Sequence, residues 1–73
     1  MLLFRSATNE FLGETNSLVG IRYLIESYLR TGNNDCHNIQ MLVTSDNKIK
    51  VQYVYNYLSE SPIDGEIEFY IRE

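Results

Sequence analysis

Residues 16–31, with the sequence NSLVGIRYLIESYLRT, decide the fold. Apolar side chains recur in this stretch at helical spacing, and five of them fall within an arc of about 100°, the width of a core-facing stripe. These five are Leu18, Ile21, Ile25, Tyr28 and Leu29. Thr15, Asn16 and Ser17 are three candidate N-caps, and Gly32 suits a helix C-terminus. The stretch therefore predicts one amphipathic helix that lies on a sheet.

The flanking sequence alternates between apolar and polar residues, which is typical of strands. Residues 2–7 and 11–15 surround the polar residues 8–10 and predict a first hairpin. Residues 39–44 and 48–57 predict a second hairpin after a polar connection at 33–38, and residues 66–72 predict a last strand after a turn at Pro62 and Asp64-Gly65. We therefore expect an α+β fold with an antiparallel sheet, in the order β-β-α-β-β-β. A chain of 73 residues has room for one core, so residues 1–73 are expected to form a single domain.

The pattern of apolar residues also predicts how the second hairpin pairs. A two-residue loop would place Val43 opposite Lys50, which mixes apolar and polar side chains on each face. A three-residue loop at 46–48, or one bulge residue, instead aligns apolar side chains. The expected pairs are Val43 with Val51, Met41 with Tyr53 and Ile39 with Tyr55. A slip of one residue would turn every side chain to the other face, so the second arrangement is favoured.

Charge is concentrated at the end of the chain. The net charge is −4. Basic and acidic residues cancel within residues 1–59, and the excess comes from Glu60, Asp64, Glu66, Glu68 and Glu73 against Arg72 alone. Because duplex nucleic acid is bound through clustered Lys and Arg, six scattered basic residues argue against direct nucleic-acid binding. No run of apolar residues is long enough for a membrane span, and we expect a cytoplasmic protein.

Asp35, Cys36 and His37 are the only cluster that suggests catalysis or metal binding. Neighbouring side chains on an extended chain point to opposite sides, so Cys36 and His37 do not form a nucleophile and base pair locally. One Cys and one His also fall short of the three or four ligands of a zinc site. The single cysteine fits a reducing compartment, and glycine-rich phosphate loops are absent. We therefore expect no cofactor, no metal and no enzymatic activity.

Tyrosines and carboxylates supply the candidate binding residues. Tyr57 is expected beyond the reach of the helix, and Tyr23 is on the helix face opposite the core stripe. Tyr70 points outward from the last strand beside Glu66 and Glu68. Tyrosine is enriched at protein interfaces, and an acidic strip complements a basic surface. The leading hypothesis is a small non-enzymatic protein-binding module that regulates or inhibits a larger protein.

The composition and the outer face of the helix suggest further hypotheses. Low alanine with abundant Asn, Ile and Tyr suits a phage or mobile element, in which the role would be anti-defence. Gly20, Leu24 and Ser27 lie on the outer helix face, where a close neighbour would explain the glycine, so a homodimeric structural or accessory protein is one alternative. A small metal or thiol protein centred on Cys36 and His37 is the other.

Overall fold

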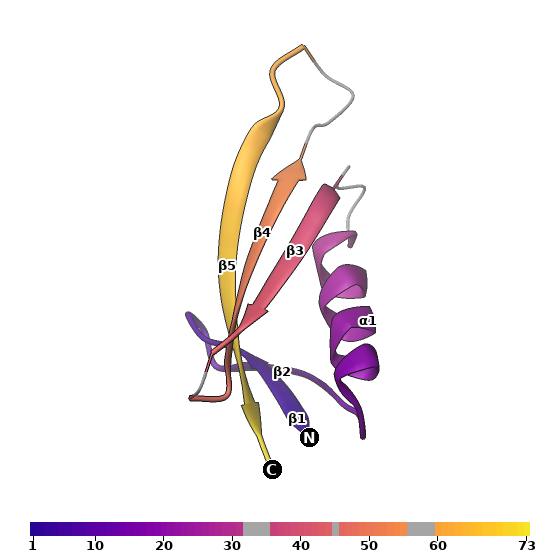
Figure 1. The fold of residues 1–73 in the computed structure, drawn as a ribbon, viewed down its shortest axis with the longest axis vertical. Helices are drawn as coiled ribbons and strands as arrows, with labels where there is room; N and C mark the ends of the chain where they lie inside the picture. The colour runs from indigo at the N-terminus through magenta and orange to yellow at the C-terminus, as the bar shows by residue number, and fades with distance from the viewer. Residues whose placement is uncertain (32–35, 45, 56–59) are drawn as a thin grey trace.

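The computed structural model describes residues 1–31, 36–44, 46–55 and 60–73. It contains one helix and five strands in the predicted order, which confirms the α+β class (Figure 1). The elements are β1 (Leu2–Arg5), β2 (Glu10–Glu14), α1 (Leu18–Leu29), β3 (His37–Val43), β4 (Lys48–Tyr55) and β5 (Ile63–Arg72). No helix in the described part of the chain is long and apolar enough to cross a membrane.

The five strands form one antiparallel sheet in the order β2-β1-β5-β4-β3. Two hairpin-connected groups, β1–β2 and β3–β4–β5, join because β1 pairs with β5, from Leu2 opposite Arg72 to Arg5 opposite Phe69. The first and last strands of the chain therefore lie side by side at the centre of the sheet. Helix α1 lies on one face, and the ends of β4 and β5 extend beyond it in Figure 1. We call the face away from α1 the open face.

Ser17 is the N-cap of α1, and its Oγ accepts a hydrogen bond from the backbone N–H of Gly20 at 3.1 Å. Of the three candidate N-caps, the structure uses the last, and α1 is two residues shorter at each end than residues 16–31. Ile21, Ile25 and Leu29 are buried, as predicted. Leu18 was predicted to be in the core but is 55% exposed. The first turn adjoins the connection from β2, rather than the sheet, through the contact of Gly20 with Thr15.

The close neighbour of Gly20 is Thr15 of the same chain. A Cβ added at Gly20 would overlap the Thr15 side chain, and its distance to the Thr15 Cβ would be 2.8 Å. Leu24, on the same part of the helix, packs against Gly13 of β2. These internal contacts account for the small residue without a second molecule. The Gly20 and Leu24 pattern that suggested an outer face for dimerisation is thus explained by the packing of β2 and its connection on α1.

The register predicted for the second hairpin is wrong by two residues. Val43 lies opposite Ile49, not Val51, and Met41 lies opposite Val51, not Tyr53. The backbone N–H of Thr44 donates to the carbonyl of Lys48 at 2.8 Å, and Asn47 has a φ of 58°. This left-handed residue ends the turn one residue earlier than expected. A shift of two residues keeps the faces, so apolar side chains still meet apolar side chains.

The turn predicted at Asp64-Gly65 is also wrong, because both residues belong to β5. Asp64 lies opposite Val54, and Gly65 lies opposite Tyr53. A Cβ on Gly65 would collide with the ring of Tyr53, so the absence of a side chain at Gly65 makes room for the Tyr53 ring of the neighbouring strand β4. The strand therefore runs ten residues, Ile63–Arg72, rather than starting at residue 66.

The core lies between α1 and the sheet. Its fully buried side chains come from all parts of the chain: Phe69, Leu3, Ile21, Ile25, Ile49 and Val51. Every buried side chain among the described residues is apolar or is Cys36. Cys36 was expected in a polar connection, but only 4% of it is exposed. Its thiol donates to the Leu29 carbonyl at 3.3 Å, so it fills the core at the end of α1.

Candidate protein-binding surface

The open face of the sheet carries three of the five predicted binding residues. Glu66, Glu68 and Tyr70 alternate along β5 with the buried residues, and they therefore share the face away from α1. Tyr23 is 71% exposed on α1, which covers the opposite face, so the structure does not bring it near the other three. Tyr57 lies outside the described residues.

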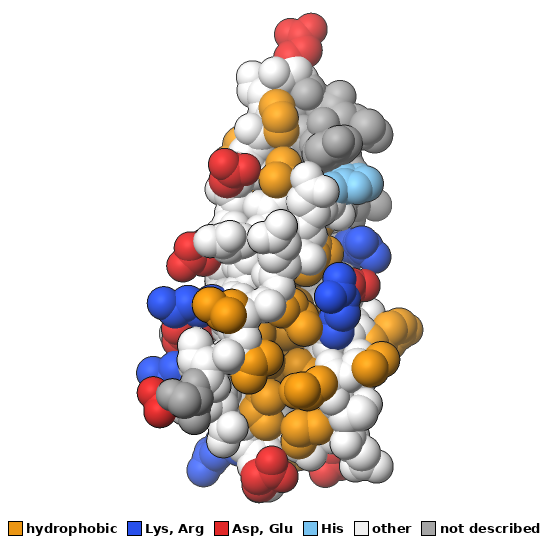
Figure 2. Space-filling view, in the orientation of Figure 1, with side chains coloured by type: hydrophobic (Ala, Val, Ile, Leu, Met, Phe, Trp, Pro, Cys, Tyr) orange, Lys and Arg blue, Asp and Glu red, His pale blue; other side chains and the backbone are white. Residues whose placement is uncertain are grey.

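Three carboxylates, Asp64, Glu66 and Glu68, form what we call the acidic row. They are spaced two residues apart on β5 and lie opposite Val54, Gln52 and Lys50 of β4. The ion pairs between described side chains all involve Glu26 of α1, so the acidic row takes part in none of them. Figure 2 shows acidic side chains along the β5 side of the molecule, with Lys or Arg side chains beside them in the lower half of the view. The row therefore makes no ion pair within the described residues, but Lys50 offsets part of its charge at Glu68, so the negative charge is concentrated at Asp64 and Glu66.

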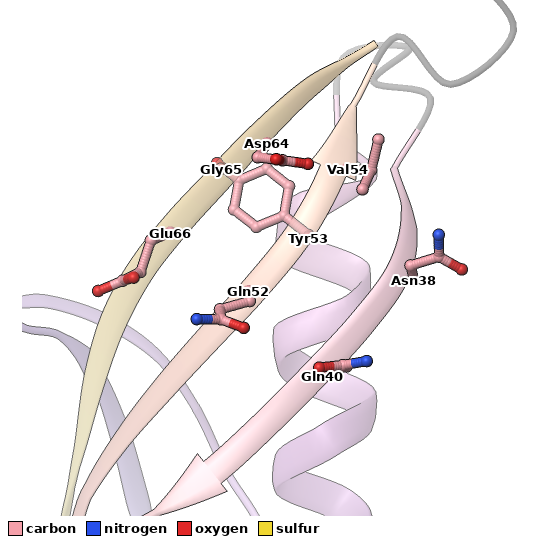
Figure 3. Close-up of a pocket in the computed structure, with 8 residues that line it drawn as sticks. All are labelled: Asn38, Gln40, Gln52, Tyr53, Val54, Asp64, Gly65 and Glu66. Carbon is pink, nitrogen blue, oxygen red and sulfur yellow. The ribbon is translucent and has the colours of Figure 1, made fainter.

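Neutral polar side chains continue this surface towards β3. Gln40, Gln52 and Glu66 stand in one row across β3, β4 and β5, because Gln40 pairs with Gln52 and Gln52 pairs with Glu66. They line a hollow of about 570 Å³ together with Asn38, Val54 and Asp64 (Figure 3). Amide side chains offer both donors and acceptors, so this hollow can accept hydrogen-bonding groups from a partner.

An aromatic row lies at the other end of the open face. Phe4 of β1 stacks on Tyr70 of β5, with ring centroids 5.1 Å apart and an interplanar angle of 10°. Phe11 of β2 lies next to Phe4 at 5.4 Å and is 55% exposed. The Tyr70 hydroxyl donates to Oδ1 of Asn9 at 2.9 Å. Tyr70 is thus held in place by its neighbours, and Phe11 supplies the exposed apolar area.

Sequence reasoning missed Phe4 and Phe11 as surface residues. The alternation of side chains along β1 was the available signal. Leu3 is buried, and the next residue on a strand points to the opposite face, so Phe4 is expected on the open face. Their meeting with Tyr70 depends on the pairing of β1 with β5, which joins strands at opposite ends of the chain. Short-range patterns do not encode that pairing.

The side of the sheet that faces α1 has a second hollow, of about 450 Å³. Its described lining includes Arg5, Tyr28, Tyr53, Tyr55 and Cys36. The Arg5 guanidinium donates to the Tyr28 hydroxyl at 2.8 Å. Burial raises the pKa of Tyr53, and the nearby Cys36 thiol adds to the rise. The hollow is therefore lined by aromatic rings that internal contacts already engage.

Cys36 and His37 occupy different environments. Cys36 is in the core, whereas His37 is exposed at the start of β3, opposite Val54. Within the described ranges, no three His, Cys, Asp or Glu side chains are grouped so that they could hold a metal ion.

Comparison of the chain with models of known families, with curated proteins and with solved structures finds no match in any of the three.

Proposed function

We propose that the chain is a non-enzymatic protein-binding module, and that the open face of its sheet binds a larger protein with a basic surface. The observation that carries the proposal is the acidic row, in which Asp64, Glu66 and Glu68 lie on the open face and take part in no ion pair of the described residues, and in which only Glu68 has a Lys, Lys50, as its cross-strand neighbour. A span of four residues on a strand is about 13 Å, which matches a patch of several Lys and Arg side chains. Such complementarity favours fast and selective association.

The aromatic row supports the same proposal. Protein interfaces combine an apolar part, often rich in aromatic side chains, with a polar rim. On the open face, Phe11 and its neighbours Phe4 and Tyr70 supply the apolar part, while the acidic row and the amides of Gln40 and Gln52 supply the polar part. The pre-arranged stack of Phe4 on Tyr70 also lowers the entropy lost on binding.

We propose further that binding inhibits the partner. A row of carboxylates on a rigid strand competes with nucleic acid phosphates for one basic surface, so a nucleic-acid-binding protein is the kind of partner it suits. An anti-defence role in a phage or mobile element is one form of such inhibition, and it is supported only by the amino-acid composition.

The test is affinity capture from the host lysate with the full chain and two charge variants. In the first variant, Glu66→Lys and Glu68→Lys reverse two charges of the acidic row. In the matched control, Glu60→Lys and Glu73→Lys make the same change in net charge at exposed positions outside the row. We expect a basic protein to be recovered by the unmodified chain and by the control, and its affinity to fall by about tenfold or more in the first variant.

Calorimetric titration of the recovered protein completes the test. The affinity for the unmodified chain should fall as salt rises, because the contact is between opposite charges. Equal affinity of the two charge variants would contradict the acidic row as the binding site. Failure of the unmodified chain to recover any protein above background would contradict the protein-binding function itself.

A further inference from the structure

The two edge strands of the sheet differ in how they are protected against pairing. Strand β2 has Glu10 and Glu14 at its ends, Gly13 between them, and a bulge in its pairing with β1. Charges, bulges and short length are the usual means of blocking an edge. Strand β3 has no Asp, Glu, Lys, Arg or Pro in His37–Val43, and its Leu42 and Val43 are 64% and 46% exposed. Strand β3 is therefore the edge that is open to another strand.

The backbone of β3 is oriented for such pairing. The backbone N–H of Thr44 donates to the carbonyl of Lys48 on β4. Every second residue of a strand points its backbone groups to the same side, so Leu42 and Gln40 also direct their N–H and C=O groups towards β4. Met41 and Val43 then direct theirs to the outer edge, where no described strand lies. Asn38, with a φ of 55°, lies in the irregular pairing between His37 and Gln40. The regular part of the edge is thus residues 40–44, and Leu42 is its midpoint.

We propose that β3 pairs antiparallel with β3 of a second copy of this chain, about a two-fold axis at Leu42. Met41 then lies opposite Val43 of the second copy, and each pair exchanges two backbone hydrogen bonds through the outward N–H and C=O groups. Leu42 faces Leu42 of the second copy on the open face. The two sheets become one continuous sheet of ten strands, with both α1 helices on the same side.

The charges of the chain select β3 over β2 as the edge at which a second copy pairs. Each chain has a net charge of −4, so two copies repel one another at most contacts. Strand β3 brings no carboxylate to the junction, whereas a β2–β2 contact would bring Glu10 and Glu14 of both copies together. An antiparallel pair of identical strands is also self-complementary, which is the requirement of a two-fold interface.

Apolar side chains extend the contact beyond the strand. Figure 2 shows hydrophobic side chains gathered between α1 and β3 in the lower half of the molecule. Leu18 of α1 and Val43 of β3, which are 55% and 46% exposed, contribute apolar area on this side. In the proposed dimer the two copies of this patch lie on the same side of the sheet, next to the two-fold axis. Burial of Val43 and Leu42 then removes the largest exposed apolar area of the edge from water.

Sedimentation equilibrium of the full chain tests the proposal. We expect a mass of twice the 8.5 kDa of one chain at micromolar concentration. Leu42→Lys should weaken dimerisation by about tenfold or more, because two like charges would face each other across the axis. Val19→Lys makes the same charge change on α1, at a side chain that is 79% exposed, and should leave the dimer intact. A monomer in the unmodified chain, or a dimer that Leu42→Lys does not weaken, would overturn the proposal.

Disulfide trapping tests the register independently of the charge variant. In a Cys36→Ala background, Leu42→Cys places two thiols at facing positions of a non-hydrogen-bonded pair, where the Cα atoms are about 4.5 Å apart and a disulfide can form. We expect rapid covalent dimerisation under mild oxidation. Tyr23→Cys in the same background, on the outer side of α1, should run as a monomer on a non-reducing denaturing gel. Equal trapping of both variants would overturn the assignment to β3. The open-face proposal is tested with variants of Glu66 and Glu68, and the dimer proposal with variants of Leu42. A failure of either proposal can therefore be told apart from a failure of the other.

Discussion

Replacing Gly20 with alanine should destabilise the protein, although alanine is the better helix former. In a helix, this change normally stabilises by up to about 1 kcal/mol. Here the added Cβ would lie 2.8 Å from the Thr15 Cβ and would overlap the Thr15 Oγ1. Rotation of the Thr15 side chain moves Oγ1 but not Cβ, so part of the clash is independent of the rotamer.

Backbone hydrogen bonds also hold Thr15 in place, so a shift of its Cβ would cost free energy. Its N–H donates to the Met1 carbonyl at 3.0 Å, and its carbonyl accepts from the N-terminal amine of Met1 at 2.9 Å. Overpacking of this kind typically costs about 1 to 3 kcal/mol. After subtraction of a helix gain of about 1 kcal/mol, Gly20→Ala should lower the free energy of unfolding by up to about 2 kcal/mol.

Urea denaturation followed by far-ultraviolet circular dichroism measures this effect, with two comparisons. Ser27→Ala, at an exposed position of the same helix, should stabilise by about 0.5 kcal/mol. In a Thr15→Gly background, which removes the obstructing Cβ, Gly20→Ala should change sign and stabilise. If Gly20→Ala stabilises the unmodified chain, or has the same effect in both backgrounds, the contact with Thr15 is not the reason for the glycine.

Three other substitutions or conditions have expected outcomes. Ser17→Ala removes the N-cap hydrogen bond to Gly20 and should lower the free energy of unfolding by about 1 kcal/mol in urea; no change would mean that Asn16 or Thr15 caps instead. Gly65→Ala should destabilise the chain in thermal unfolding, and Tyr53→Ala should relieve this effect, because the Tyr53 ring occupies the space of the added Cβ. Burial raises the pKa of Tyr53 above its ordinary 10.0, so the stabilisation from its neutral phenol is present below pH 10 and is lost as the pH rises through the folded-state pKa. Alkaline titration of stability should therefore show a smaller loss in Tyr53→Phe, and an equal loss would contradict the buried environment of this phenol.

The candidate surface was only partly predictable. The outward direction of Glu66, Glu68 and Tyr70 follows from alternation with buried residues on one strand, which is a local property. The aromatic row was not predictable in the same way, because Phe4 and Phe11 meet Tyr70 only through the pairing of β1 with β5. Tyr23 and the acidic row lie on opposite sides of the molecule, because α1 covers the face of the sheet that the acidic row does not occupy. The sequence does not show which face the helix covers.

The sequence by itself determined the elements and their order. Helical spacing in residues 16–31 and alternation in the strands depend on side chains a few residues apart, and they require no knowledge of distant contacts. Cys36 shows the limit of this reasoning, since a polar stretch of sequence concealed a side chain that fills the core at the end of α1.

Tertiary structure decided the register of β3 on β4, the extension of β5 through Gly65, and the joining of β1 to β5. Each of these depends on a contact between residues far apart in the chain or on one backbone angle, such as the left-handed Asn47. Even shifts of register preserve the apolar faces, so alternation cannot distinguish them. The sequence suggested that Gly20 marks a docking site, but in the structure it makes room for Thr15. It suggested that Gly65 marks a turn, but Gly65 makes room for the Tyr53 ring. Only the folded chain sets the positions of Thr15 and Tyr53.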